Sequence, residues 1–291
     1  LYARTVNGDA YSKAVKDEVI SIIREDLGKV DMVIYSLAAP KRVLPDGTVC
    51  NSVLKTTDKP YTNKTIDLKS RTISEVTIEP ATAEEIDATV KVMGGEDWRD
   101  WIEALSAADV LVKDAVTVAY SYIGPELTHP IYLDGSIGRA KAHLYQTAQE
   151  MNEQLSDIHA YVSVNKALVT QSSAAIPVVP LYISILYKVM KEKGLHEGCI
   201  EQMYRLFHDK LYGIAVRTDT DGYIRLDDYE MQPDVQEEVS AIWNTLSNDN
   251  LAANTDLDGY WSDFYRLFGF GANNVNYDAD TEVVVPIAHV E

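Results

Sequence analysis

The sequence predicts an α/β fold with a doubly wound parallel sheet and helical additions. Through about residue 170 of the 291, short apolar runs alternate with amphipathic stretches, the pattern of parallel strands linked by helices. The run 30–38 is nearly continuously apolar and has the length of a strand, which is typical of a strand covered on both faces. The remaining residues are mostly helical in pattern. These observations together favour a sheet that carries a helical C-terminal part.

The first elements are predicted as follows. Residues 4–9 resemble the end of a strand, and residues 11–27 have the apolar spacing of a helix that Gly28 ends. Residues 41–82 are richer in Lys, Thr, Asp and Pro and show weak periodicity. We expect an inserted loop there, with a possible hairpin at 62–78.

Two helices and two strands are expected next. Thr82 is a good N-cap for a helix that runs through Val92, and a second helix covers 98–108. An apolar strand then leads to Tyr122, and another strand covers 158–168. In the rest of the chain, helices are predicted at about 196–212, 234–248 and 258–267.

We interpret 1–291 as a single domain with two additions. The segment 171–213 holds a flap and helices, and 214–291 forms a mostly helical extension. An apolar stretch inside the first addition contains Pro177 and Pro180, so it is either a core helix with an irregular start or a flap over an apolar ligand. Its position directly after a strand end favours the flap.

Charge and composition exclude several classes of protein. A formal net charge of −19 disfavours nucleic acid and anionic membranes as partners. Cys50 and Cys199 are the only cysteines, which suits a reduced cytoplasmic protein without a disulfide framework. The sequence has no apolar run of membrane-spanning length and no signal-peptide pattern.

No metal site is expected. Residues 219–224 resemble the middle of a calcium-binding loop, but Arg217 and Asp228 occupy its first and last ligand positions. We therefore predict a turn between two short strands. The six histidines show no metal-ligand spacing.

A pair of tyrosines and a lysine offer reductase chemistry. Tyr122 and Tyr132 can each donate a phenol proton, and Lys141 can hold a cofactor ribose. In one unbroken helix, nine residues turn through roughly 900°, which would place Tyr132 and Lys141 on opposite faces. They can share a pocket only if the helix starts between them.

The sequence provides such a break. Gly135 and Gly138 lie between the two side chains, and Ser136 is a good N-cap, so we start the helix near Ile137. Lys141 then falls inside the buried stripe of that helix. The alternative is a lysine that lays its stem on the core and extends its ammonium to water.

A phosphate-binding glycine loop is missing from the sequence. No GxGxxG element follows a strand, and neither 135–138 nor 269–271 has the required context. Either the protein is not a dinucleotide enzyme, or the loop lies upstream of Leu1. We expect the latter, an N-terminal truncation of a Rossmann-like domain.

Several segments resemble one known family. They are 119–128, the pair Tyr132 and Lys141, 162–170, 188–194 and 196–202. Together they resemble the trans-2-enoyl-CoA reductases and the FabV-type enoyl-ACP reductases, which belong to the short-chain dehydrogenase/reductase group. The resemblance covers essentially the whole chain, and the gap from Tyr132 to Lys141 matches that family's spacing.

The resemblance implies roles for individual residues. Tyr132 matches the catalytic proton donor, Lys141 the lysine on the nicotinamide ribose, and Tyr122 the tyrosine on the substrate thioester. The other matches are Asp9 and Ala10 with the adenine, Leu37 and Ala38 as a backbone pair on the cofactor, Leu168, Val169 and Thr170 with the nicotinamide and pyrophosphate, and 176–187 with the substrate flap.

The implied function is NADH-dependent reduction of trans-2-enoyl-CoA, or of the enoyl-ACP, in fatty acid biosynthesis. The partner is then an acyl thioester, and the protein is a monomer or homodimer. Lys188, Lys191 and Lys193 are candidates for CoA phosphates, or form a solvated helix face. Two alternatives stay open: a related reductase of 3-oxoacyl thioesters, and a non-catalytic remnant of a dinucleotide fold. Without the glycine loop, we expect the chain alone to bind NADH weakly or not at all.

Overall fold

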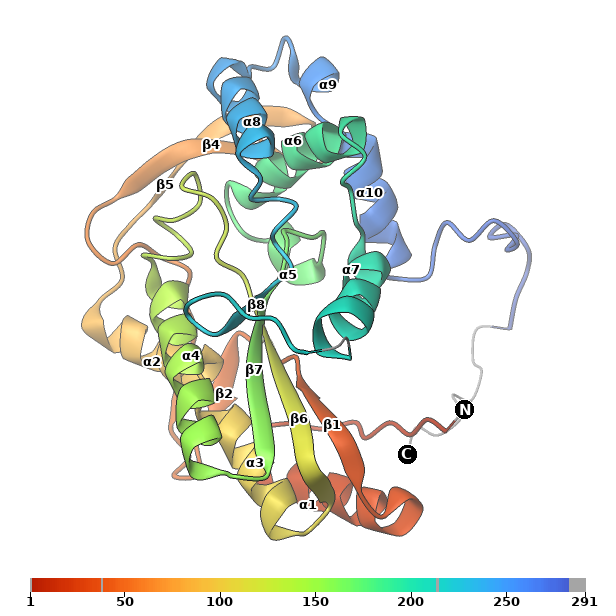
Figure 1. The fold of residues 1–291 in the computed structure, drawn as a ribbon. Helices are drawn as coiled ribbons and strands as arrows, with labels where there is room; N and C mark the ends of the chain where they lie inside the picture. The colour runs from red at the N-terminus through yellow and green to blue at the C-terminus, as the bar shows by residue number, and fades with distance from the viewer. Residues whose placement is uncertain (1, 38, 213–214, 283–291) are drawn as a thin grey trace.

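The computed structural model describes residues 2–37, 39–212 and 215–282. Its main sheet has the strand order β1-β6-β7-β8, and every neighbouring pair is parallel (Figure 1). The strands are β1 (Val30–Tyr35), β6 (Leu111–Ser121), β7 (Ile158–Val164) and β8 (Tyr223–Arg225). The predicted parallel sheet is therefore confirmed.

Helices cover both faces of this sheet. Along β6, Ala115 and Ala119 face a core shared with α1, α3 and α4, whereas Val118 faces a core shared with α7 and η2. The alternation follows from the pleat, which sends successive side chains to opposite faces. The helices are α1 (Lys13–Ile22), continued by the π-helical turn η1 (Ile23–Leu27), α3 (Glu96–Ala107), α4 (Ser136–Gln154), α7 (Cys199–Arg205) and the π-helical turn η2 (Leu206–Leu211).

Two expectations for the N-terminal part are wrong. Residues 4–9 form no strand, because only Thr5 makes an isolated bridge and the first regular element is α1. Strand β1 is only partly covered, since none of its residues is fully buried and Ile34 is 36% exposed. Within the described residues β1 lies at the edge of the sheet and pairs only with β6.

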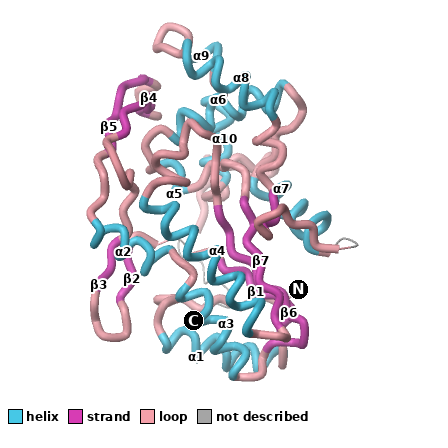
Figure 2. Tube along the Cα trace, turned by 60° about the vertical axis from the view of Figure 1, so that its left-hand side comes forward, coloured by secondary structure: helices cyan, strands magenta, loops and turns pink. Residues whose placement is uncertain are grey.

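The segment 41–82, expected to be a loop with one possible hairpin, forms two hairpins. Strands β4 (Tyr61–Asp67) and β5 (Thr72–Ile78) pair antiparallel, which confirms the predicted hairpin. A second hairpin of β2 (Lys41–Val43) and β3 (Val49–Asn51) was not predicted, and it lies beside α2 (Figure 2). Helix α2 (Ala83–Met93) begins at the predicted cap, where Thr82 and Glu85 form a capping box.

The C-terminal part packs around one buried helix. Helix α6 (Val179–Glu192) has almost its whole length buried, and it contacts α8, α10 and β4. Val178 precedes it with φ 73°, and Pro180 lies in its first turn. This is the core helix with an irregular start. The helices around it are α5 (Gln171–Ala174), α8 (Pro233–Thr245), α9 (Leu251–Asn254) and α10 (Leu257–Arg266).

The calcium-like segment is a turn. The N–H of Gly222 donates to the carbonyl oxygen of Asp219 at 3.1 Å, and β8 follows. The expected second strand is wrong, because β8 pairs with β7 in the main sheet and not with a hairpin partner. Across the described ranges, no group of three or more His, Cys, Asp or Glu could hold a metal ion. Nor is any described helix both long and apolar enough to cross a membrane.

Candidate functional site

The carboxyl ends of β1, β6 and β7 lie at one edge of the sheet because the strands are parallel (Figure 1). Leu37 follows β1, Tyr122 follows β6, and the segment 165–170 follows β7. Ligands of open parallel sheets bind at this edge. The structure thus brings three of the predicted groups to the same side of the fold.

The two predicted site tyrosines are in contact. Their ring centroids are 4.9 Å apart and the rings are inclined at 82°, an edge-to-face pair. Tyr132 lies on a turn in which its N–H donates to the carbonyl oxygen of Thr128 at 2.9 Å. Its hydroxyl makes no hydrogen bond with any described residue, so the phenol is available to a ligand.

Two glycines allow this turn to lie against α4. A Cβ on Gly138 would be 1.9 Å from the carbonyl oxygen of Leu133 and 2.3 Å from that of Tyr132. A Cβ on Gly135 would meet the carbonyl oxygen of Ile131 at 2.5 Å. Real Cβ atoms do not approach backbone this closely, so only glycine permits the contact. The predicted break between Tyr132 and Lys141 is confirmed.

The predicted cap of α4 is wrong by one residue. Gly135 is the N-cap and Ser136 is the first helical residue. The Ser136 hydroxyl is not free to cap the helix, because it donates to the carbonyl oxygen of Val53 at 2.6 Å and accepts from the N–H of Lys55. The hydrogen bonds with Val53 and Lys55 take the place of the N-cap bond that Ser136 was predicted to make.

Lys141 lies next to the end of β6. Its Nζ donates to the carbonyl oxygen of Tyr120 at 3.2 Å, two residues before Tyr122. The ammonium therefore points to the strand end and not to water, unlike the alternative of an extended surface lysine. Burial lowers the pKa of Lys141 from its ordinary 10.5 to about 8.

The lowered pKa of Lys141 should make the free energy of unfolding depend on pH. Between pH of about 8 and 10.5 the unfolded chain binds more protons at Lys141 than the folded chain, so this group makes the free energy of unfolding rise with pH. Replacing Lys141→Met removes the cost of the buried cation. We expect the variant to be more stable than the wild type at neutral pH, and the advantage to shrink as pH rises through that window. Urea denaturation at several pH values measures it; a constant difference would contradict the assignment.

Both tyrosines stay protonated at neutral pH. Burial, and secondly the negative charge of Glu230, raise the pKa of Tyr132 and of Tyr122 above the usual range. Protonated phenols are hydrogen-bond donors, as the predicted roles require. Sequence reasoning missed Glu230, whose Oε1 accepts from the Tyr122 hydroxyl at 3.2 Å. It lies in an irregular turn far along the chain, and no periodicity or motif marks it.

The segment 168–170 makes local contacts. The N–H of Val169 donates to the hydroxyl of Tyr187 at 3.3 Å, and the Thr170 side chain caps α5 by accepting from the N–H of Ser173. The Leu168 carbonyl oxygen accepts from the Ser173 hydroxyl. These bonds hold the segment against α5 and α6.

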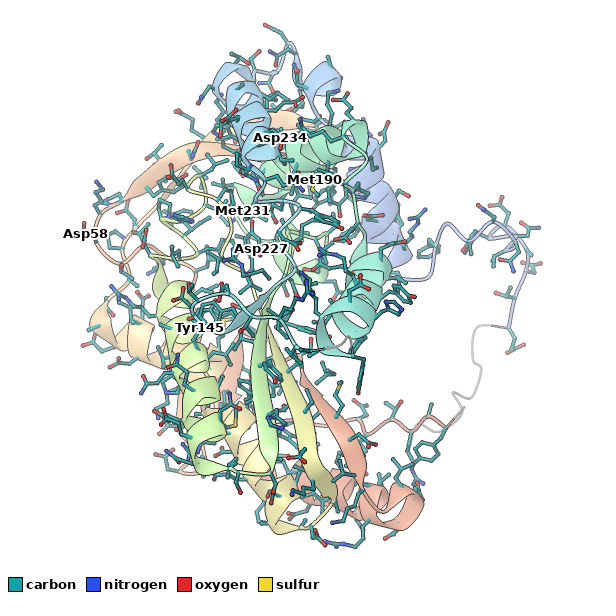
Figure 3. The ribbon with its side chains drawn as sticks, viewed as in Figure 1. Asp58, Tyr145, Met190, Asp227, Met231 and Asp234 are labelled. Carbon is teal, nitrogen blue, oxygen red and sulfur yellow. The ribbon has the colours of Figure 1, made fainter. Side chains whose placement is uncertain are left out.

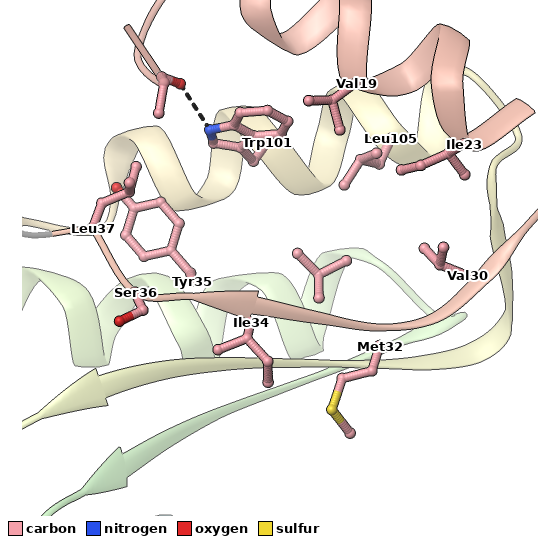
Figure 4. Close-up of a pocket in the computed structure, with 12 residues that line it drawn as sticks. Val19, Ile23, Val30, Met32, Ile34, Tyr35, Ser36, Leu37, Trp101 and Leu105 are labelled. Carbon is pink, nitrogen blue, oxygen red and sulfur yellow. Dashed lines mark hydrogen bonds between the residues drawn. The ribbon is translucent and has the colours of Figure 1, made fainter. Parts of the chain in front are cut away.

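A cavity of about 400 Å³ runs along β1 between α1 and α3 (Figure 4). Ala10 and Leu37, two of the predicted cofactor residues, line one end of it. The indole N–H of Trp101 donates to the Ala10 carbonyl oxygen at 3.1 Å and holds that end in place. Asp9 is exposed and accepts from the N–H of Tyr11 at 3.0 Å. Ala38 lies outside the described residues.

The three lysines considered for CoA phosphates are already paired with acidic side chains. Lys188 pairs with Glu192 and Lys191 with Asp256. Lys193 contacts Asp234 at 2.9 Å and Glu238 at 3.2 Å. The arrangement fits the alternative of a solvated helix face.

A parallel sheet with flanking helices, and with two tyrosines and a lysine at its carboxyl edge, defines an α/β reductase of the Rossmann-like class. The family model of the trans-2-enoyl-CoA reductase catalytic region matches residues 1–212, and that of the enoyl reductase FAD binding domain matches 218–281. The chain belongs to the trans-2-enoyl-CoA reductase family, which confirms the predicted family.

Curated relatives carry the same description. The trans-2-enoyl-CoA reductase [NADH] of Ruminiclostridium cellulolyticum is 54% identical over 99% of this chain and 73% of its own length. The enoyl-[acyl-carrier-protein] reductase [NADH] of Flavobacterium psychrophilum is 52% identical over 100% of this chain and 74% of its own length. Both relatives are named as NADH-dependent, although the second family model is named for FAD.

A solved structure confirms the fold. The trans-2-enoyl-CoA reductase of Treponema denticola, in complex with NAD, superposes with a TM-score of 0.93 at 48% identity. The match covers 97% of this chain and 71% of that one.

Proposed function

We propose that this protein is an NADH-dependent reductase that converts trans-2-enoyl thioesters of CoA, or of acyl-carrier protein, to the saturated acyl thioesters. The observation that carries the proposal is the contact between Tyr122 and Tyr132 beside Lys141, at the carboxyl edge of the sheet. The curated relatives support it, because they are named for this activity and match 99% and 100% of this chain.

The residues of the chain would hold the cofactor as follows. Lys141 is a cation close to the end of β6 and would fix the hydroxyls of the nicotinamide ribose. The apolar cavity end at Ala10 and Leu37 would take the flat adenine ring, and Asp9 is close to it in the chain. The backbone of 168–170 would face the nicotinamide and pyrophosphate. When bound, NADH supplies the hydride for the β-carbon of the substrate.

The tyrosines would act on the thioester. Negative charge develops on the thioester oxygen as the β-carbon is reduced, and the hydroxyls of Tyr132 and Tyr122 would stabilise it by hydrogen bonds. Tyr132 would be the proton donor, since its hydroxyl is not engaged elsewhere among the described residues. A proton then reaches the α-carbon. The segment 171–178, which leads into the buried helix α6, would cover the acyl chain and exclude water.

Setting and organisation are part of the proposal. The protein would work in the cytoplasm, in fatty acid biosynthesis, as a monomer or homodimer without nucleic-acid or membrane partners. The chain would act as one reductase domain, in which 214–291 is a helical extension. The two family models meet between 212 and 218, close to that division.

The direct test is to follow NADH consumption, by the protein extended upstream of Leu1 where the glycine loop is expected, with crotonyl-CoA, crotonyl-ACP and acetoacetyl-CoA. We expect oxidation of NADH with the enoyl thioesters and little with acetoacetyl-CoA. Consumption with acetoacetyl-CoA alone would overturn the proposal in favour of a 3-oxoacyl reductase. No consumption with any of the three thioesters, together with failure to bind NADH, would instead favour the non-catalytic alternative.

A further inference from the structure

Glu230 is a fully buried carboxylate in the turn between β8 and α8. Asp227, three residues before it, and Met231, directly after it, lie between the sheet and helices α6 and α8 in the view of Figure 3. Its Oε1 accepts from the hydroxyl of Tyr182 at 2.6 Å and from that of Tyr122 at 3.2 Å. Its Oε2 accepts from the N–H of Ala167 at 2.7 Å.

These donors come from separate parts of the proposed site. Tyr122 follows β6 and contacts Tyr132, Ala167 directly precedes the segment 168–170, and Tyr182 lies on α6. One carboxylate therefore links Tyr122, the start of the segment 167–170 and helix α6 by hydrogen bonds. The Tyr122 hydroxyl makes no other hydrogen bond with a described residue.

Stability alone explains this group poorly. Burying a carboxylate costs free energy that hydrogen bonds and a nearby cation only offset. Burial raises the pKa of Glu230, while the bonds from Tyr182 and Ala167 and the charge of buried Lys166 act in the opposite direction. Without Tyr122 the carboxylate would keep the bonds from Tyr182 and Ala167.

The two phenol bonds to Oε1 are unequal. The bond from Tyr182 is short, and the Tyr182 oxygen is held in addition by the side-chain amide of Gln236 at 3.2 Å. The bond from Tyr122 is long and is thus the weaker of the two. A phenol has one proton, so Tyr122 cannot donate to Glu230 and to a ligand at once.

We propose that Glu230 is the positioning residue of Tyr122, and that it holds the phenol beside Tyr132 in a hydrogen bond that the substrate's thioester oxygen replaces. This inference rests on the proposed function. Glu230 orients the free site, and Tyr182 and Ala167 keep its carboxylate satisfied once Tyr122 turns to the substrate.

A double-mutant cycle tests the proposal. In Glu230→Gln the amide oxygen stays with the N–H of Ala167, so the amide nitrogen faces the tyrosines and Tyr122 loses its acceptor. We expect KM for crotonyl-CoA to rise by about tenfold with kcat little changed, because the bond to Glu230 orients Tyr122 in the free site and is absent once the substrate is bound. In a Tyr122→Phe background the same substitution should cause almost no further rise in KM. Effects on KM that simply multiply would overturn the proposal, because they would mean that Glu230 does not act through Tyr122.

A spectroscopic readout is independent of activity. In protein labelled at the tyrosine Cζ with carbon-13, the Tyr122 resonance, assigned with Tyr122→Phe, should shift in Glu230→Gln. It should also shift in the wild type when crotonyl-CoA is added without NADH. Glu237→Gln changes an exposed residue on α8; it is the matched control and should leave the Tyr122 resonance unshifted. If the protein fails to reduce crotonyl-CoA, the proposed function fails, whereas an unmoved Tyr122 resonance in Glu230→Gln overturns this proposal whatever the activity.

Discussion

Replacing Tyr132→Phe is expected to lower kcat for crotonyl-CoA by about a hundredfold to ten-thousandfold, the range for loss of a positioned proton donor. The KM for NADH should change little, because the phenyl ring and its contact with Tyr122 remain. Stability should not fall, since the hydroxyl makes no hydrogen bond with a described residue. Steady-state kinetics and thermal unfolding together measure the two parts of the prediction.

Tyr204→Phe is a matched control, because it removes a tyrosine hydroxyl away from the proposed site. Tyr204 is 64% exposed on α7 and stacks on His208, away from the tyrosine pair. Tyr204→Phe should therefore retain wild-type kinetics. Full activity in Tyr132→Phe would remove Tyr132 from its proposed role, even if the reductase activity itself were established.

Adding a single methyl group at Gly138 is expected to damage the site through the backbone. The new Cβ would stand 1.9 Å from the carbonyl oxygen of Leu133, so the turn that carries Tyr132 must move away from α4. Overpacking of this kind costs about 1–3 kcal/mol of stability. A displacement of the phenol by about 1 Å would lower kcat by about a hundredfold. Urea unfolding and kinetics of Gly138→Ala measure both effects.

Gly198→Ala is the control for this substitution. There the added Cβ would meet only the end of the flexible Glu201 side chain, at 2.9 Å, and no backbone atom. We expect a small change in stability and unchanged kcat. If Gly138→Ala behaved like Gly198→Ala, close packing of the turn on α4 would not be what places Tyr132.

Local sequence patterns predicted the elements whose stability is local. Thr82 and Glu85 cap α2 through contacts three residues apart, and the hairpin of β4 and β5 arises from neighbouring segments. The pair of glycines before α4 likewise marked the break that lets Tyr132 and Lys141 face one edge of the sheet.

Predictions failed where a distant partner decides the structure. Ser136 has a side chain that favours the N-cap position, but its hydroxyl donates to the carbonyl oxygen of Val53, 83 residues away in the chain. The run at β1 is as apolar as a central strand, yet within the described residues it pairs on one side only. Composition cannot report which neighbours a strand will have, because that depends on the order of strands in the sheet.

The sequence by itself determined the class of fold, the family, and the tyrosines and lysine at the strand ends, since periodicity, turn residues and motif spacing are all recorded along the chain. Only the tertiary structure decided that Tyr122 and Tyr132 touch, that Lys141 donates to β6, and that Glu230 joins Tyr122 to α6. Glu230 is 108 residues from Tyr122 and 48 from Tyr182. Such a buried hydrogen bond is specified by the packing of whole elements, and it leaves no periodic signal around either partner.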